Sequence, residues 1–164
     1  IGGDYNFKHC TFINSYPFAR QSPSIFLNNY YEDIDGNLQY RDLIQASFGN
    51  CIIDGNMETE IVFDKDEQAT FNYKLDHCVL KASEDYWGEE ANSTSQEVIL
   101  LNNDENCGIV NFNQDDLTTI KSDFFLGEES IAIDAGSVEI ANDVPYDIES
   151  NPRTTNPDIG WSEY

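Results

Sequence analysis

Four cysteines and two histidines are the residues of this chain whose types and spacing could do covalent chemistry. His9 directly precedes Cys10, and His77 directly precedes Cys78. A thiolate beside an imidazole is a pair used in nucleophilic catalysis. Neighbouring residues of a strand face opposite sides, however, so the two side chains of each dipeptide would point apart. The spacing therefore favours free, buried thiols, and the absence of a C-x-x-C pair disfavours structural zinc.

Acidic residues dominate the charge of the chain. There are 31 Asp and Glu against 8 Lys and Arg, which gives a net charge of −23. Such a field repels phosphates and anionic lipid, so nucleic acid is not an expected partner. The oxygen-rich stretches 64–67 and 102–106 offer the ligands that Ca²⁺ prefers, but neither matches the EF-hand loop. Calcium therefore stays open as a cofactor without assigned ligands, and no carboxylate pair of the glycosidase type stands out.

Three cysteines lie in a phrase that the chain repeats, in residues 5–14, 46–55 and 73–82. Apolar residues stand five and three positions before each cysteine and two positions after it, and alternation at period two predicts strands with one buried face. The alternation slips just before the cysteine, where the chain places His9, Asn50 and His77. This slip predicts a bend between two strands that face one core.

The cysteines of the three phrases are 41 and 27 residues apart. A period of roughly 20–30 residues of short strands is typical of solenoids, so the first spacing needs an insertion. With further strands expected at 24–29, 60–64 and 97–101, the pattern predicts an all-β parallel β-helix of about three to four coils. Cys107 would mark a distorted last coil. A β-sandwich is the main alternative, but it does not explain the recurring cysteine. Equivalent residues of a solenoid stack, which predicts a column of Cys10, Cys51 and Cys78 and a polar ladder of His9, Asn50 and His77.

Two segments interrupt this repeat. Asp-Gly between strand-forming residues predicts a β-hairpin over 28–40, and 83–96 is expected to be a polar loop. Exposed aromatic rings in such segments can stack on sugars or fill a partner's pocket, or they can pack across strands within the hairpin. The candidate binding residues are Tyr30, Tyr31, Tyr40, Tyr86 and Trp87, with Tyr16 and Phe18 of the same type.

Residues 117–164 are expected to form an irregular C-terminal cap that follows the coils of residues 1–116. The last coil of a solenoid exposes strand edges and core, so it needs a cover. This segment combines apolar residues with prolines, which fit poorly into sheets. Arg153 is one of few cations, and we expect it to pair with Asp134, Asp147 or Asp158. A substrate-binding arginine is the less favoured alternative.

The tail carries the phrases SIAIDAG (130–136) and PRTTNPDIG (152–160). Together with YNFKHCTFIN (5–14), these resemble the C-terminal portion of right-handed parallel β-helix proteins of the Bacteroidetes type, the choice-of-anchor-Q-like group. Ile131 stands where that group has a proline, and Trp161 stands near a usual small residue. The resemblance covers nearly the whole chain and implies a right-handed solenoid. It says little about activity, because one fold serves many functions.

The resemblance implies a secreted protein, free outside a Gram-negative cell or held at its outer membrane as a lipoprotein. Together with the composition, it predicts a non-catalytic scaffold or binding module within an outer-membrane assembly, with glycans or outer-membrane proteins as partners. The alternative is the end of a polysaccharide lyase or glycoside hydrolase whose groove lies mostly upstream. We further expect a fragment of a longer chain, whose open N-terminal face is covered by upstream coils or by a partner protein.

Overall fold

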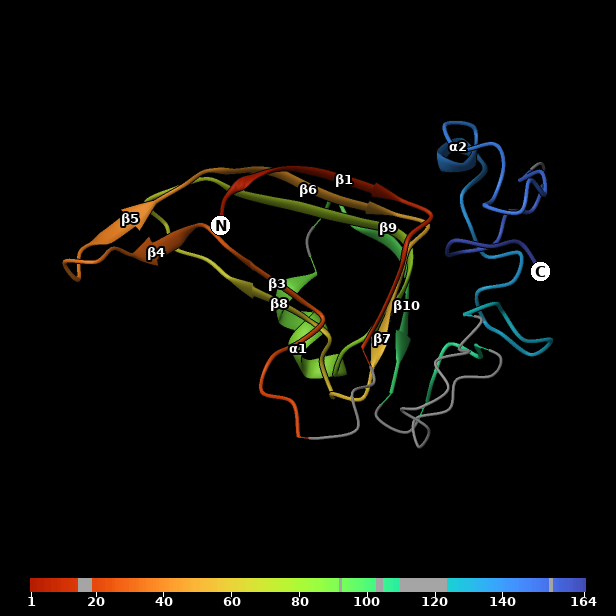
Figure 1. The fold of residues 1–164 in the computed structure, drawn as a ribbon, viewed down its shortest axis with the longest axis horizontal. Coiled ribbons are helices and arrows are strands. Elements are labelled where there is room, and N and C mark those ends of the chain that lie inside the picture. Colours follow the sequence, from red (N-terminus) through yellow and green to blue (C-terminus); the bar gives the residue numbers. More distant parts are fainter. Residues whose placement is uncertain (15–18, 92, 103–104, 110–123, 154) are drawn as a thin grey trace.

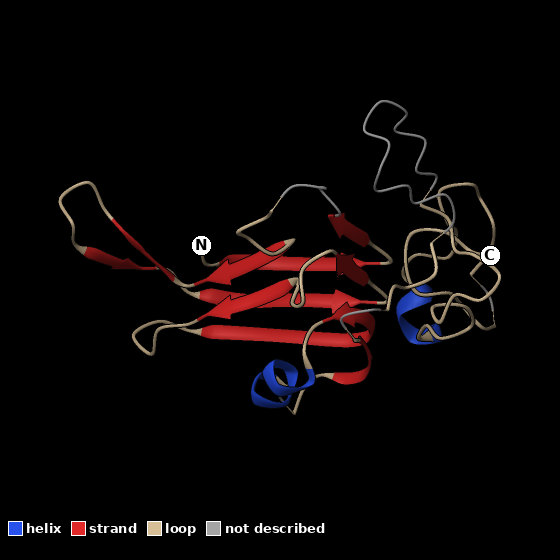
Figure 2. Cartoon of the chain, turned by 90° about the horizontal axis from the view of Figure 1, so that it is seen from below, coloured by secondary structure: helices blue, strands red, loops and turns tan. Residues whose placement is uncertain are grey.

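The computed structural model describes residues 1–14, 19–91, 93–102, 105–109, 124–153 and 155–164. These residues form mostly β-structure, and the repeated phrase supplies its largest part (Figures 1 and 2). The elements are β1 (Gly3–Lys8), β2 (Thr11–Asn14), β3 (Ile25–Asn28), β4 (Tyr30–Glu32), β5 (Leu38–Tyr40), β6 (Leu43–Gly49), β7 (Ile52–Gly55), β8 (Ile61–Asp64), β9 (Phe71–Lys81), α1 (Glu84–Glu90), β10 (Gln96–Leu101) and α2 (Val138–Ala141).

A bent sheet of six parallel strands is the centre of the fold. Its order is β1-β6-β9-β7-β2, and β10 pairs with β9. Each of the first two phrases supplies one strand on either side of the bend, whereas β9 runs through the bend and pairs with both β6 and β7. In Figure 1, β1, β6 and β9 form one wall, and β7 and β10 turn downward from it to form the next. The predicted bend between two strands is therefore confirmed.

A left-handed residue makes each bend. His9, Asn50 and His77 each have φ of 50°, a conformation that Asn and His adopt more readily than most residues. Glu97 has the same conformation, with φ of 49°, and Val98 pairs with Cys78. The fourth copy of the phrase is thus centred on Val98. The prediction that Cys107 marks this copy is wrong, because Val98 occupies the cysteine position. The sequence hid this copy, since it preserves the apolar residues after the cysteine position but not the cysteine itself.

The predicted stacking of equivalent residues is confirmed on both sides of the bend. Phe7 pairs with Phe48, which pairs with Leu75, and Phe12 pairs with Ile53, which pairs with Leu80. The Phe7 and Phe48 rings are stacked, with centroids 5.1 Å apart. These columns form the main hydrophobic core, which lies inside the bend of the sheet.

The prediction of a β-helix solenoid of three to four coils is wrong. The strands are divided among the bent sheet, which forms a parallel half-barrel, a parallel pair β3-β8 and an antiparallel pair β4-β5 that projects away from it (Figure 1). The physical reason lies at β8, where the Tyr86 hydroxyl accepts the Phe63 N–H at 2.9 Å. Helix α1 therefore occupies the side of β8 on which a further strand would pair. The repeat correctly predicted which strands pair, but it did not predict a helix on the third wall.

Helix α1 also corrects the expected loop over 83–96. Ser83 begins the helix as its N-cap, accepting a hydrogen bond from the Tyr86 N–H. The hairpin over 28–40 is confirmed: Tyr30 pairs with Tyr40, and the turn contains Gly36 at φ of 81°. Asp33 organises this turn by accepting the N–H groups of Asp35 and Asn37.

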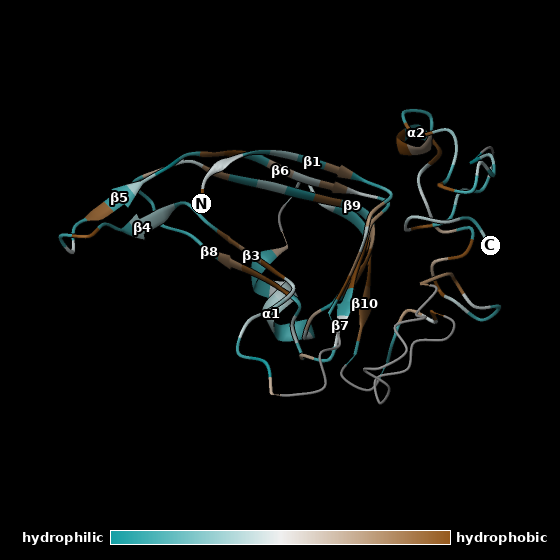
Figure 3. Cartoon of the chain, viewed as in Figure 1, coloured by the Kyte–Doolittle hydropathy of each residue, from teal (hydrophilic) through white to brown (hydrophobic). Residues whose placement is uncertain are grey.

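The tail lies in a different place from the one expected. It packs beside the outer face of β2, β7, β9 and β10 (Figure 1), whereas a solenoid cap would cover the exposed strand edge and core of the last coil. A second core forms there, in which Ile52 and Val79 of the sheet meet Ile159 of the tail, all three with no exposed surface. Apolar colour covers much of β7, β9 and β10 in Figure 3. β7 and the second half of β9 are therefore buried on both faces.

A buried ion pair fixes the corner that joins β2, β3 and β8. Arg20 donates to both carboxylate oxygens of Glu60, at 2.7 and 2.9 Å, and the Glu60 side chain has no exposed surface. Burial alone would raise the pKa of Glu60, but hydrogen bonds from Arg20, Met57 and Ser24 outweigh it, so that the pKa is lowered. The carboxylate is thus charged and fully bonded at neutral pH.

Among the described residues, neither helix has the length or the apolar character needed to cross a membrane.

Candidate binding edge

The strands β1, β2 and β3 form one open edge of the fold, which we call the open edge. In the part of the chain that the structure describes, each of them pairs on one side alone: β1 with β6, β2 with β7, and β3 with β8. Backbone N–H and C=O groups on the other side of such strands are available to a further strand. The open edge is therefore a template for β-strand addition.

Side chains behind the open edge are half-buried, whereas their partners one strand further in are buried. Phe7 and Phe12 keep part of their surface exposed, while Phe48 is 1% exposed and Ile53 has no exposed surface. The same contrast holds for Ile25 and Leu27 against Ile61 and Phe63, and for Cys10 against Cys51. The core thus continues to the open edge, and among the described residues no layer closes it there.

The inner face of the open edge contains an apolar pocket of about 120 Å³. Its lining consists of Tyr5, Phe7, Phe12, Ile25, Leu27 and Phe48. These side chains come from β1, β2, β3 and β6, so the pocket opens where the core columns begin. A bulky apolar side chain is what this pocket fits.

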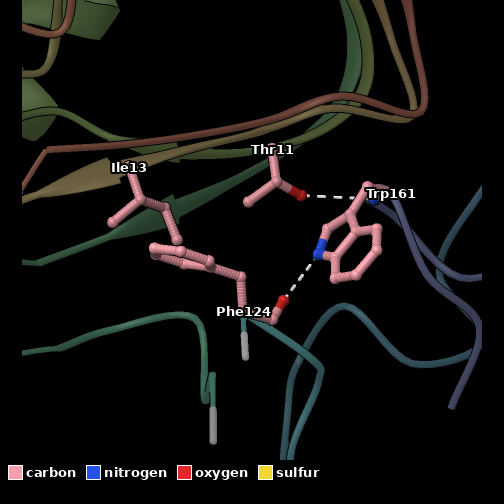
Figure 4. Close-up of a pocket in the computed structure, with 4 residues that line it drawn as sticks. All are labelled: Thr11, Ile13, Phe124 and Trp161. Carbon is pink, nitrogen blue, oxygen red and sulfur yellow. Dashed lines mark hydrogen bonds between the residues drawn. The ribbon is translucent and has the colours of Figure 1, made fainter. Parts of the chain in front are cut away.

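A larger pocket of about 350 Å³ lies on the outer face, where the tail meets β2 (Figure 4). Thr11 and Ile13 line it from the strand, and Phe124 and Trp161 line it from the tail. Two hydrogen bonds hold Trp161 in place. Its backbone N–H donates to Thr11 Oγ1 at 3.2 Å, and its indole Nε1–H donates to the Phe124 carbonyl at 2.7 Å. The sequence prediction missed this pocket.

Cys10, Cys51 and Cys78 lie in equivalent positions, as predicted, and all four cysteines are free thiols. Cys51 and Cys78 have no exposed surface, and Cys107 is 1% exposed, but Cys10 is half-buried because it lies on the open edge. The pKa of Cys10 is lowered to about 7, mainly because the Cys51 thiol hydrogen-bonds to it. Burial raises the pKa of Cys51. Cys10 is therefore the thiol with the highest reactivity toward reagents in solution.

The predicted polar ladder exists for two of its three members. Asn50 Nδ2 donates to His9 Nε2 at 2.9 Å, and His9 Nδ1 donates to the Gly160 carbonyl at 3.3 Å. His77 is not part of this ladder, because its Nδ1 bonds to the Asp76 carboxylate at 2.7 Å. Both ring nitrogens of His9 thus connect the first bend to the second bend and to the tail.

The pKa of His9, whose ring joins Asn50 to Gly160, is lowered. Burial and, to a smaller extent, the nearby positive charge of Arg153 together lower the pKa of His9 from 6.5 to about 4. Asn50 extends the connection by accepting the Ser137 N–H at 2.8 Å and donating to its carbonyl at 3.0 Å. The neutral imidazole is therefore a structural bond between sheet and tail.

Arg153 pins the tail, but with another partner than expected. It pairs with Glu163 and also donates to the Trp161 carbonyl at 2.8 Å. Asp158 instead accepts the Asp134 N–H at 2.8 Å, and Asp147 accepts the Glu163 N–H at 2.9 Å. The prediction of an Asp partner was wrong: Arg153 pairs with Glu163, and the carboxylates of Asp147 and Asp158 bond to backbone N–H groups.

The candidate aromatic residues do not form one surface. Trp87 is 8% exposed and packs in the main core, together with Tyr86. Tyr30 donates to Asp64 at 2.6 Å, and Tyr40 accepts a hydrogen bond from Gln68 at 2.6 Å. Tyr31 lies under the Arg41 guanidinium, 5.8 Å from the ring centroid. Tyr16 and Phe18 lie outside the described residues.

Within the described ranges, no group of three or more His, Cys, Asp or Glu side chains is arranged to hold a metal ion. The stretch 64–67, which offered oxygen ligands for calcium, instead makes local bonds: Lys65 pairs with Glu90 at 2.8 Å, and Asp66 accepts the Gln68 N–H at 2.8 Å.

No family model matches this chain. A comparison with curated proteins gives no match either, and no solved structure matches it.

Proposed function

We propose that this chain is a non-catalytic binding module and that the open edge is its contact surface. The observation that carries the proposal is the contrast in burial across the first two layers of strands. Phe7 and Phe12 are half-buried, while their pairing partners Phe48 and Ile53 are buried. An unclosed core next to unpaired strand backbone is the arrangement that strand-adding interactions use.

The hydrogen bonds of the two histidines and of Cys10 favour a binding function over catalysis. The His9 ring bonds to Asn50 and Gly160, and the His77 ring bonds to Asp76. Cys10 Sγ donates to the Lys8 carbonyl at 3.4 Å, so that its bond goes to the backbone and not to an imidazole. The thiol–imidazole pairs suggested by the dipeptides are therefore not formed.

A screen of linear peptides displayed on phage tests this function. We expect enriched peptides that bind the folded chain and lose binding to Phe7→Asp or Ile13→Lys, two substitutions on opposite faces of the open edge. Ile44→Lys is the matched control, because Ile44 is 60% exposed on β6, one strand in from the open edge, and lines neither pocket of that edge. Peptides that bind every variant equally, or no enrichment at all, would show that the open edge is not the contact surface.

The exported, surface-attached location that the family resemblance implies belongs to the same proposal. Labelling of Cys10 on intact cells by a membrane-impermeant maleimide tests it, and labelling that requires cell lysis would contradict it. The enzyme alternative has a separate test: turnover of any polysaccharide by the complete protein would overturn a non-catalytic role.

A further inference from the structure

The two pockets of the open edge lie on opposite faces of one strand. The inner pocket includes Phe12, and the outer pocket includes Thr11 and Ile13. Successive side chains of a strand point to opposite faces, so these three residues of β2 alternate between the pockets. A ligand that fills both pockets must therefore present side chains at the same period of two.

An extended polypeptide next to β2 meets this condition. Its backbone would pair with the free side of β2, and alternate side chains would enter the inner and outer pockets. A helix would present side chains at a period of 3.6 and could fill one pocket at a time. The geometry thus selects β-structure over other polypeptide ligands.

The existing sheet indicates direction and register. Every pairing in the bent sheet is parallel. The left-handed residues His9 and Asn50 lie side by side, joined through the His9 N–H to the Gly49 carbonyl at 2.9 Å and the Ile52 N–H to the Cys10 carbonyl at 2.9 Å. A further parallel segment that bends with the sheet would place its own left-handed residue beside His9.

Charge indicates what kind of chain carries this segment. With 31 acidic against 8 basic residues, the chain repels a second copy of itself and attracts a basic partner. Asp4 and Asn6 lie exposed on the edge strand β1, and the charge of Lys8 on the same strand is paired with Asp143. The charge therefore favours a segment of a separate protein with Lys or Arg beside its apolar positions.

We propose that the open edge binds an extended segment of a basic partner protein, which pairs in parallel with β1 and β2 and inserts alternating apolar side chains into the inner and outer pockets. This inference rests on the proposed function and specifies its partner. It differs from that function in requiring one direction and one register of pairing.

Cys10 allows a direct test of the register. The probe is a synthetic peptide with the sequence of residues 46–55, ASFGNCIIDG, extended by two lysines at each end. Its cysteine is activated as a mixed disulfide with thionitrobenzoate. The Cys10 thiolate attacks the peptide sulfur, the peptide–Cys10 disulfide forms, and thionitrobenzoate leaves with the electron pair. Parallel strands lie about 4.8 Å apart, within the range of Cα separations that a disulfide spans.

The control peptide exchanges the cysteine with the isoleucine that follows it. This shift of one position moves the thiol to the opposite face of the strand. We expect capture of the first peptide at Cys10 to be at least about tenfold faster than capture of the control, because docking raises the effective concentration of its thiol. Equal rates for both peptides, or faster capture of a peptide with reversed sequence, would overturn parallel docking.

Variants locate the contacts. Trp161→Ala and Ile13→Lys are expected to slow capture of the first peptide, whereas Ile44→Lys leaves it unchanged. A small aromatic disulfide serves as the folding control: it reacts with one thiol in each folded variant and with all four in an unfolded one. A dimer of the chain that loses its contact in Ile13→Lys would also overturn the proposal, since a second copy would then occupy the edge.

The two levels of the proposal fail separately. If the register-matched peptide shows no preference while the phage screen still gives peptides that depend on the open edge, the parallel segment is wrong and the binding function stands. If neither experiment gives binding that depends on the open edge, both are wrong.

Discussion

Acid should loosen the contact between the bent sheet and the tail, through His9. The perturbation is a change of pH from 7 to 4, compared between the natural chain and His9→Asn. Asn is the matched replacement, because Asn50 occupies the equivalent bend with the same φ of 50°. The variant therefore keeps the left-handed bend and removes the titrating group.

The magnitude follows from the pKa of His9, which burial and Arg153 lower from 6.5 to about 4. Between these two values the unfolded chain binds a proton that the folded chain does not, so the free energy of unfolding falls as the pH falls. At about 1.4 kcal/mol for each factor of ten, the difference corresponds to a loss of about 3 kcal/mol. The loss begins near pH 6.5 and is complete near pH 4.

Urea unfolding of both proteins at pH 7, 6, 5 and 4 measures this loss. Carboxylates contribute to the pH dependence of both proteins alike, so the difference between the two curves isolates His9. We expect that difference to change by about 3 kcal/mol across the range. NMR of the imidazole nitrogens gives the pKa directly, and His77→Asn assigns the signals, because the chain has two histidines. Parallel stability curves, or a His9 that titrates near 6.5, would refute the reasoning.

Further substitutions test the rest of the structure. Glu60→Gln breaks the buried pair with Arg20, so we expect a loss of about 3–5 kcal/mol in the free energy of unfolding at pH 7; a loss below about 1 kcal/mol would show that the pair is solvated. Trp87→Ala removes a core ring that is 8% exposed and should lower stability by about 3–5 kcal/mol, with the affinity of edge-binding peptides unchanged once the variant is folded. Tyr31→Ala removes the ring beneath Arg41 and is expected to change the melting temperature little, since the hairpin lies outside both cores; a large fall would show that the hairpin supports the sheet.

The sequence predicted local pairing well, because equivalent slots of the repeated phrase hold side chains of like size. Phe7, Phe48 and Leu75 share one slot, and they do lie side by side. The bend was also visible, as the loss of alternation before each cysteine. Its cause, a left-handed residue, could have been recognised from His and Asn, which tolerate that conformation.

The same pattern did not determine how the walls close. Helix α1 spans seven residues, too few for an apolar stripe to be recognised against the background of a loop. Its two aromatic residues, Tyr86 and Trp87, suggested an exposed binding tip, yet they complete the core. Whether such rings face inward depends on the space beneath them, which the sequence does not contain.

The place of the tail had a signal that the sequence prediction did not use. The position directly after the cysteine is apolar in the second and third phrases, where it holds Ile52 and Val79. In the fourth copy, Ile99 occupies the same position after Val98. Apolar residues on the outward face require a cover, and the tail supplies it. The outer pocket followed from this cover, because Trp161 reaches Thr11 on the edge strand.

The most direct test of an open edge is the reactivity of the four thiols in the native protein. Brief treatment with iodoacetamide at neutral pH, followed by mass spectrometry of the peptides, measures each of them. An open edge predicts one adduct, on Cys10, with Cys51, Cys78 and Cys107 modified after unfolding alone. Protection of Cys10 equal to that of Cys51, or modification of the buried thiols at the same rate, would contradict it.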